Sequence, residues 1–391
     1  MNIDSTNNHN RDYSSTRVAL MLGNFVIGLA IIGVAGMLSE LAKGLDVTIQ
    51  QAGLLVTAGA IVLCVGSPLT VWATSAFDRR LLLTSSLFIV ALGHFASAFA
   101  PNYSALLALR VLMLIAAALF TPVAASTVAM IVPQAERHGA ITFVFLGWSL
   151  SVAVGLPAVA FLAAHAGWQA TFAALGVGLL ACAALVFQGL PHGLSGTPIL
   201  FSSWGSLGRN RFVVTLLALT AVQIAGQFVV FTYLAPLLRR LASADVMAIG
   251  IFFSTFGVMG FIGNVIATRL VTKLGPFTTS GLALLSIFLG FTLWSLGVSV
   301  LIVMGAGVAL WGLGFAAINS MQQARLIGAV PALGSAAVAL NTSAVYVGQA
   351  IGSALGGVLF AHDLLRAQGY AAMILVGLSL VLLATTHDSR L

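Results

Sequence analysis

Ionisable side chains that could carry protons or bind a charged solute are few in this sequence. Of the nine acidic residues, only Glu40 lies within a long apolar segment, close to its end, and Arg110 is the basic residue inside another. Placing such groups in an apolar medium costs about 2.5–3.5 kcal/mol each, which points to a function. If the two side chains meet, protonation of Glu40 would release Arg110 to attract an anionic or strongly polar solute. The pair therefore predicts a proton-coupling site.

Neutral amides and aromatic side chains are the second group that could contact a solute. Gln223 and Gln227 lie one helical turn apart, so they share a helix face. Amides hydrogen-bond hydroxyls, carbonyls and nucleobase edges, and aromatic rings offer a stacking surface. The alternative, in which the amides join helices to one another, stays open. The predicted substrate-binding residues are Asn24, Arg110, Trp148, Gln223, Gln227, Asn319, Asn341, Tyr346 and Gln349.

Motifs that would indicate catalysis are absent from the sequence. It contains no phosphate-binding loop of the Walker type, no His-Glu-x-x-His and no Gly-x-Ser-x-Gly. Cys64 and Cys182 stand far apart, without the spacing of a disulfide framework, a metal site or a redox pair. We therefore expect no enzyme activity, no catalytic residue, no metal and no cofactor.

The composition predicts the elements that must position these side chains. Hydrophobic residues make up 60% of the 391 and charged residues 6%, with a mean hydropathy of +1.09, which excludes a water-soluble surface. The strands of a membrane barrel would alternate polar and apolar residues, and these segments do not. The sequence predicts an all-α protein that spans a lipid bilayer with twelve helices of about 20 residues each. They fall near 18–42, 51–75, 82–100, 104–132, 140–163, 169–190, 212–236, 246–270, 278–296, 299–325, 332–360 and 370–386.

Polar stretches divide the twelve helices into two bundles of six. The segment 191–211 is rich in Gly and Ser and is predicted to be a cytoplasmic linker between a bundle at 18–190 and a bundle at 212–386. Residues 1–17 are expected to form a disordered cytoplasmic tail, and 387–391 a second tail. The loop at Asp78 recurs faintly about 195 residues later, which supports parallel halves. Parallel halves with a site between them are a transporter architecture.

Basic residues indicate the orientation in the membrane. The side that carries both termini would hold eleven Lys and Arg residues, and the opposite side four. Because such bases accumulate on the cytoplasmic side, both termini are expected in the cytoplasm. The bases are scattered between apolar segments and form no patch, which argues against a nucleic-acid partner.

Two short motifs indicate moving parts. Asp78, Arg79 and Arg80 place a carboxylate and two guanidiniums after the second helix, where they can pair with one another and with a helix terminus to latch one conformation. The alternative is simple membrane anchoring by the two bases. Gly155 and Pro157 let a neighbouring helix come close and bend the fifth helix. Ordinary tight packing is the alternative there.

In order and spacing, these motifs resemble the major facilitator superfamily, and within it the twelve-helix drug and sugar efflux proteins typified by arabinose and purine-nucleoside exporters. The resemblance covers nearly the whole chain and implies a gate lock at Asp78, antiport through the helix-5 element and a cavity-lining Arg110. Related exporters commonly carry an acid where this chain has Ile31, so one familiar proton carrier is missing. The motifs are 36–42, 51–55, 78–80, Arg110, 155–157, 167–172 and 341–357.

The sequence therefore predicts a secondary active transporter of a bacterial inner membrane. It would be a monomer that exports a small neutral or anionic solute, such as a sugar, a nucleoside or a drug-like compound, by alternating access, with protons as the exchanged ion. The scarcity of cavity acids argues against lipophilic cations as substrates. Two alternatives stay open: a proton-independent facilitator of the same fold, and a membrane receptor without transport.

Overall fold

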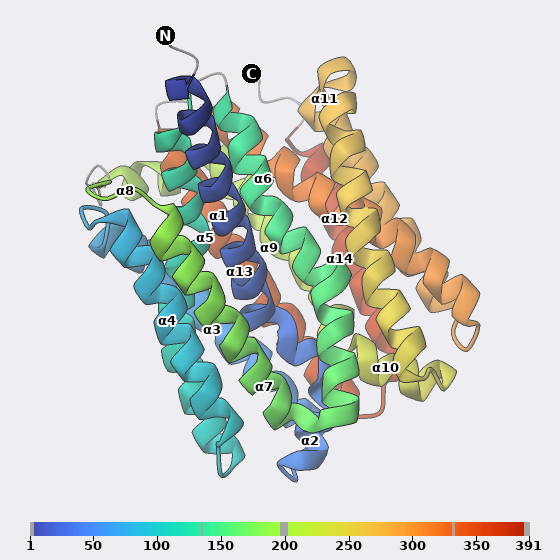
Figure 1. Cartoon of the computed structure of the whole chain (residues 1–391). Coiled ribbons are helices and arrows are strands. Elements are labelled where there is room, and N and C mark those ends of the chain that lie inside the picture. Colours follow the sequence, from blue (N-terminus) through green and yellow to red (C-terminus); the bar gives the residue numbers. More distant parts are fainter. Residues whose placement is uncertain (1–3, 134–135, 196–201, 331–332, 387–391) are drawn as a thin grey trace.

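The computed structural model describes residues 4–133, 136–195, 202–330 and 333–386 as helices joined by short turns (Figure 1). We call α1 to α7 the first half and α9 to α14 the second half. The first half comprises α1 (Asp4–Gly36), α2 (Leu38–Gly44), α3 (Ile49–Ala73), α4 (Arg79–Ala98), α5 (Tyr103–Ile131), α6 (Arg137–Leu150), the π-helix η2 (Ser151–Gly155) and α7 (Leu156–Gly189). After α8 (Ser202–Arg209), the second half comprises α9 (Arg211–Phe231), α10 (Leu234–Ala242), α11 (Val246–Leu296), α12 (Leu301–Ala329), α13 (Gly334–Ala361) and α14 (Leu365–Ala384).

Ten of the described helical segments are long and apolar enough to cross a membrane, and two of them contain two spans each. The backbone turns sharply at Gly167 (φ 84°) and at Gly275 (φ 75°), conformations that a residue without a Cβ adopts readily. At Gly275 the chain reverses at the end where α1 begins (Figure 1). The described residues therefore hold twelve spans, as the sequence predicts.

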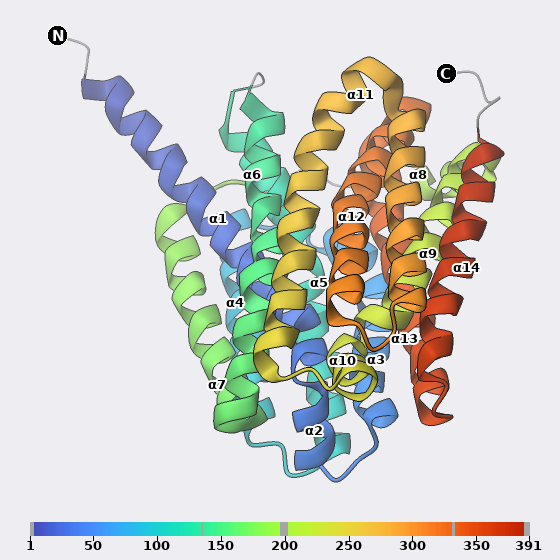
Figure 2. The same ribbon diagram turned by 90° about the vertical axis from the view of Figure 1, so that its right-hand side faces the viewer.

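The two ends of the helical bundle differ in what they carry. We call the end where α1 begins and α14 ends the terminal end, and the opposite end, which carries α2 and α10, the distal end (Figures 1 and 2). α2 and α10 are short helices separated from α1 and α9 by breaks at Met37 and at Tyr233. In both halves, the first span thus ends in a separate distal helix.

One segment prediction needs correction. Helix α1 begins at Asp4, so the expectation of a disordered tail over 1–17 is wrong from residue 4 onward. The helix continues through the polar residues before 18 and so extends beyond its apolar part. The predicted linker over 191–211 contains the short helix α8. Residues 1–3, 196–201 and 387–391 lie outside the described part of the chain.

Both halves use the same close helix packing, which is the structural form of the internal repeat. In the second half, three small residues of α13 spaced four apart pack on carbonyls of α9. In the first half, α6 and η2 place three small residues at the same spacing against α1, and the middle one, Ser151, donates a 2.6 Å hydrogen bond to the carbonyl of Phe25. The two sets are Gly348, Gly352 and Gly356, and Gly147, Ser151 and Gly155.

The close approach of α11 and α12 predicts a strong effect of one methyl group. A Cβ on Gly263 would overlap the carbonyl oxygen of Leu313, a backbone atom that cannot rotate away. We expect Gly263→Ala to lower stability by about 1–3 kcal/mol, the usual cost of overpacking. Gly139→Ala is the matched control because a Cβ there meets open space. Thermal unfolding of the purified variants measures the difference, and equal midpoints would contradict the packing described.

Candidate functional site

A small pocket lies between the two halves, near the middle of the spans. Ile32 of α1, Trp148 of α6 and Val152 of η2 form its first-half side. The second half contributes Gln227, Phe228 and Phe231 of α9, Phe256 of α11, and Trp311 and Phe315 of α12. The space open to the centre of a water molecule is about 10 Å³, room for about one water. The halves are therefore closed around this point, and any larger solute requires them to separate.

The second-half wall of this pocket is a packed cluster of aromatic rings around Trp311. The ring centres of Phe256 and Phe231 lie 4.8 and 6.0 Å from that of Trp311, in edge-to-face arrangements. Such contacts are favourable and orient the rings. The cluster holds Trp311 so that its indole Nε1 donates a 2.6 Å hydrogen bond to Oε1 of Gln227.

A chain of amides continues from Trp311 through the second half. The Nε2 group of Gln227 donates to both the backbone oxygen and the side-chain oxygen of Gln223. Gln223 in turn donates to Oδ1 of Asn319 over 3.3 Å, and Asn319 donates to the carbonyl of Phe315. The structure therefore brings together three of the predicted amides, of which only Gln227 lines the pocket.

The other predicted substrate contacts lie elsewhere. Asn24 joins α1 to α6 and α5, by donating to the carbonyl of Val144 and accepting from Thr121. Asn341 accepts a 2.8 Å hydrogen bond from Thr220 and so joins α13 to α9. Tyr346 and Gln349 belong to α13 and are not among the residues that line the pocket. For Asn24 and Asn341, the alternative of contacts between helices fits the observed geometry.

Arg110 is buried and bonded entirely to backbone carbonyls in the first half. Its Nε donates to Leu55 of α3 over 2.9 Å, and its two Nη atoms donate to Ala30 and Ile31 of α1 over 3.1 and 2.6 Å. These α1 carbonyls lie near the C-terminal end of the helix, where the helix dipole favours a cation. Arg110 therefore fixes α1 and α3 relative to α5.

The expected pair of Glu40 and Arg110 is absent from this conformation. Glu40, in α2, forms an ion pair with Arg239 of α10, whose Nη2 lies 2.7 Å from Oε1 of Glu40. Arg110 bonds to residues of α1 that precede the break at Met37, whereas Glu40 comes after that break, at the distal end. The break redirects the chain, which sequence spacing alone does not indicate. Among the described residues, Glu40–Arg239 is the ion pair that joins the two halves.

Tyr233 closes the distal end next to this ion pair. Its ring is buried, and its hydroxyl donates to the carbonyl of Ser353 in α13 over 3.2 Å. The same hydroxyl occupies the space that a side chain at Gly53 of α3 would fill. A residue of the second half thus sits in a slot of the first half. Arg240 and Asp363 add a 3.0 Å ion pair within the second half.

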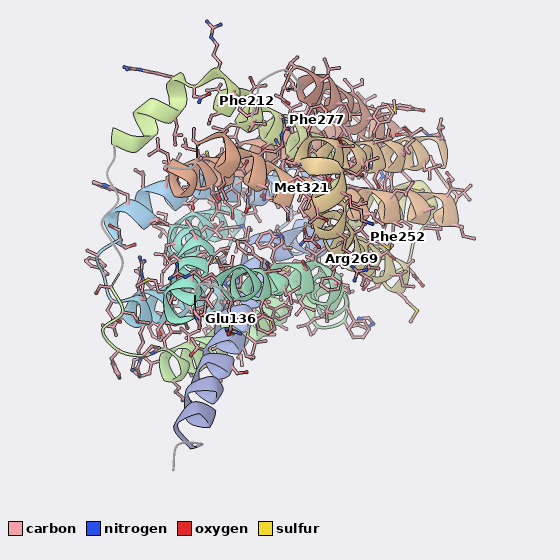
Figure 3. The ribbon with its side chains drawn as sticks, turned by 90° about the horizontal axis from the view of Figure 1, so that it is seen from above. Glu136, Phe212, Phe252, Arg269, Phe277 and Met321 are labelled. Carbon is pink, nitrogen blue, oxygen red and sulfur yellow. The ribbon has the colours of Figure 1, made fainter. Side chains whose placement is uncertain are left out.

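At the terminal end, the described ion pair stays within one half. Arg17 of α1 pairs with Glu136, which precedes α6. Viewed from this end, Glu136 lies over the first half, and Arg269, Phe277 and Met321 lie over the second (Figure 3). The charged contact between the halves is therefore at the distal end in the described part of the chain.

The loop at Asp78 holds the start of the predicted linker instead of pairing its own charges. Asp78 Oδ1 caps α4 by accepting from the backbone N–H of Leu81, and Oδ2 accepts from the N–H of Gly193. The backbone N–H of Arg79 donates to Leu194 over 2.7 Å. Arg80 contacts the ring nitrogen of His192 and lies 4.0 Å above the ring of Phe187. The predicted latch, in which Asp78 pairs with Arg79, Arg80 or a neighbouring helix in the outward-open state, stays a prediction for that state. In the present conformation, Asp78 contacts backbone N–H groups of α4 and of the linker.

This geometry predicts an effect of Asp78→Ala on the linker. Removing the carboxylate takes an acceptor from two backbone N–H groups, so the amides of Leu81 and Gly193 should exchange hydrogen faster with solvent. Asp245→Ala is the matched control because Asp245 caps α11 in the same way without touching the linker. Hydrogen exchange followed by mass spectrometry measures both. Unchanged exchange at Gly193 would show that Asp78 does not hold this segment.

The helix-5 element lies at a close contact between the two halves. Residues 151–155 form a π-helix, an irregularity that often marks a functional site. A Cβ on Gly257 of α11 would overlap the backbone of Ala153, and Gly250 lies beside Pro157. Gly155 itself faces Leu29 of α1. The element therefore allows α11 to pack directly on the first half.

Comparison with known proteins identifies this architecture. The sequence model of the Major Facilitator Superfamily matches residues 20–353. The chain belongs to the major facilitator superfamily. It is 30% identical to the inner membrane transport protein YdhP of Escherichia coli O157:H7 over 377 residues, 93% of this chain and 94% of that protein. It is 25% identical to a probable sugar efflux transporter of Mannheimia succiniciproducens over 366 residues, 93% of this chain and 91% of that protein.

Solved structures of the superfamily share the fold. A bacterial homologue of the human lysosomal transporter Spinster gives a TM-score of 0.76 at 16% identity, covering 96% of this chain and 97% of that one. A D-xylose–proton symporter gives 0.75 at 16% identity, with the same coverage. The predicted all-α fold of the major facilitator type is confirmed. Because the chain belongs to the superfamily, it is a membrane transporter and not an enzyme.

In this member of the major facilitator superfamily, three residues of the site were not predicted from the sequence. Arg239, Tyr233 and Trp311 were not singled out, although Arg239 is one of four bases on the sparsely charged side. The small number of bases on that side, together with the acidic Glu40 there, could have indicated the ion pair.

The buried His94 of α4 has a structural arrangement. Its ring packs edge-on against Phe172, and its Nδ1 bonds to the carbonyl of Val90 in the same helix. No group of three His, Cys, Asp or Glu side chains in the described residues could hold a metal ion.

Proposed function

We propose that this protein exports a small neutral solute across a bacterial inner membrane by alternating access, in exchange for protons. The observation that supports this proposal most is the pocket between the two halves. Among the described ion pairs, the one that joins the halves lies at the distal end. A closed distal end is the arrangement in which a transporter receives solute from the terminal side. Relatives named for efflux agree with this direction.

The expected orientation places the terminal end in the cytoplasm. Ser104→Cys and Gly205→Cys test it, because both residues are exposed and lie near opposite ends of the spans. In a variant whose Cys64 and Cys182 are replaced by Ala, an impermeant maleimide added to whole cells should label residue 104. Residue 205 should react only after the cells are opened. The reverse labelling would place the termini outside.

The solute that this proposal favours is neutral, which narrows the expectation of a neutral or anionic solute. Every residue that lines the pocket is uncharged. Arg110, expected to attract an anion, is 1% exposed and directs its guanidinium at three carbonyls. An anion in the pocket would therefore lose its hydration without gaining a positive partner.

Coupling to protons is proposed to act through Glu40 and Arg239. The described spans contain no acidic residue, and Glu40, at the start of the distal helix α2, is the acid whose described ion pair joins the two halves. Its side chain is 18% exposed and so remains open to protons from the distal side. Protonation would neutralise the carboxylate and weaken the contact that keeps the distal end closed. For exchange, Glu40 takes up a proton from the outside in the outward-open state, after the solute has left. It releases that proton toward the terminal side as the distal end closes and the pair with Arg239 forms again, so protons enter as solute leaves.

Exchange in reconstituted vesicles tests the proposal as a whole. Vesicles loaded with unlabelled arabinose, uridine or 4-nitrophenyl arabinoside should take up the same labelled compound faster than protein-free vesicles for at least one of the three. Failure of all three, with correctly folded and inserted protein, would favour the non-transporting receptor.

A further inference from the structure

The chemistry of the central pocket narrows the class of solute beyond neutrality. Six of its nine lining residues are aromatic, and they come from both halves. The surface that these side chains present to the pocket is apolar. A solute held there therefore meets the faces and edges of rings on opposite sides. Planar apolar groups gain most from such surroundings because rings stack or meet edge to face.

The amide of Gln227 is committed to the protein. The indole N–H of Trp311 is only a donor, so the Gln227 atom that faces it must be the oxygen. The Nε2 group then points at Gln223 and donates both its hydrogens there. Gln227 consequently keeps one free lone pair and no free hydrogen for a solute. Asn319 accepts from Gln223 and donates one amide hydrogen to Phe315, and it is not among the residues that line the pocket.

These two facts weigh against a free sugar. A pentose carries four or more hydroxyl groups, each of which hydrogen-bonds to water and must find a partner when buried. The pocket lining offers one acceptor position on Gln227 and the indole N–H of Trp148. Most hydroxyls of the sugar would stay unpaired against aromatic carbon. An aromatic compound with one or two polar groups avoids that cost.

We propose that the central pocket binds neutral aromatic compounds and selects them over free sugars. When the halves separate enough to admit it, the aryl ring lies among Trp148, Phe256 and Trp311, and a single polar substituent contacts Gln227. This inference rests on the proposed export function, whose site it describes. It assigns the pocket a class of solute that differs from the sugars named for the Mannheimia succiniciproducens relative.

The test is a matched series of three probes that separates the sugar from the ring. L-Arabinose has the sugar alone, 4-nitrophenyl α-L-arabinoside has both parts, and 4-nitrobenzyl alcohol has the ring alone. Equilibrium dialysis against the purified full chain measures binding of each. We expect both aryl compounds to bind on the order of tenfold or more tighter than arabinose, the gain from burying a ring.

Variants of the pocket assign the binding to its aromatic walls. Trp148→Ala should weaken both aryl compounds by about tenfold, and Trp148→Phe should restore most of the loss because a ring remains. Phe88→Ala is the control, since Phe88 lies on α4 with 48% of its surface exposed, away from the pocket. If Trp148→Ala fails to fold, Trp148→Phe and a comparison with Trp148→Leu give the same contrast at nearly constant volume.

The outcomes separate this inference from the export proposal. Arabinose binding as tightly as the aryl compounds would overturn the aromatic class, and so would equal aryl binding by wild type and Trp148→Ala. Either result leaves export itself standing. Aryl binding that depends on Trp148, together with no exchange of any probe in vesicles, would support the pocket chemistry and overturn export.

Discussion

Glu40→Gln is expected to abolish the concentration of solute by a proton gradient while exchange between equal solutions continues. Glutamine keeps the shape of the side chain but cannot change its charge, so it holds the site permanently in the neutral state. The contact with Arg239 at the distal end is then no longer switched by protons. Uptake of 4-nitrophenyl arabinoside into inside-out vesicles with an acidic interior measures the first property, and counterflow measures the second.

Two further variants make this prediction specific. Asp363→Asn is the control because Asp363 is also a distal acid paired with an arginine, but within the second half. It should concentrate solute as wild type does. Exchanging the charges by Glu40→Arg with Arg239→Glu should recover part of the concentrating ability, since the pair forms again. If Glu40→Gln concentrates solute as well as wild type, Glu40 does not carry the proton and a facilitator is the better account.

Arg110→Ala is expected to give the largest loss of stability among single changes in the first half. The substitution removes three charge-assisted hydrogen bonds to α1 and α3 and leaves a cavity beside Leu114 and Gly59. We expect a cost of about 3 kcal/mol or more. Ile32 follows the two bonded residues of α1 and lines the pocket, so transport should fall as well. Thermal unfolding and counterflow measure the two effects.

Conservative variants separate the charge of Arg110 from its volume. Arg110→Met fills most of the space, so it should recover the part of the stability loss that is due to the cavity, while transport stays low if the three bonds position α1. Arg110→Lys should fall between the two because one ammonium cannot span three carbonyls. Arg366→Ala, at an exposed residue of α14, is the control. A stable and fully active Arg110→Met would show that the bonds to α1 are dispensable.

The fold was largely predictable because membrane insertion leaves a strong pattern in the sequence. Twelve apolar segments with short polar breaks admit little besides twelve antiparallel helices. The start of α1 was missed because polar residues such as Asp4 to Arg11 lengthen a helix without raising its hydropathy. Length and composition mark where a helix can cross a membrane, and they do not mark where it begins.

The site was less predictable because the sequence gives residue types and not the directions of side chains. Gln227 and Trp148 were found because side-chain amides and tryptophans are few in the spans. The pairing of Glu40 was predicted wrongly because the break at Met37 moves Glu40 onto a separate helix that faces α10. Asn24 could not be distinguished from a solute contact, since an amide that joins helices and one that binds solute share the same sequence pattern.

The central claim, proton-driven export, is tested most directly by solute concentration with wild-type protein. Inside-out vesicles with an acidic interior, in which the terminal end faces outward, are given labelled 4-nitrophenyl arabinoside at equal concentration on both sides. The account predicts that the interior concentration rises above the exterior and returns to equality when a protonophore collapses the pH gradient. Equal concentrations throughout, with rapid exchange that ignores the gradient, would contradict proton coupling and leave a facilitator.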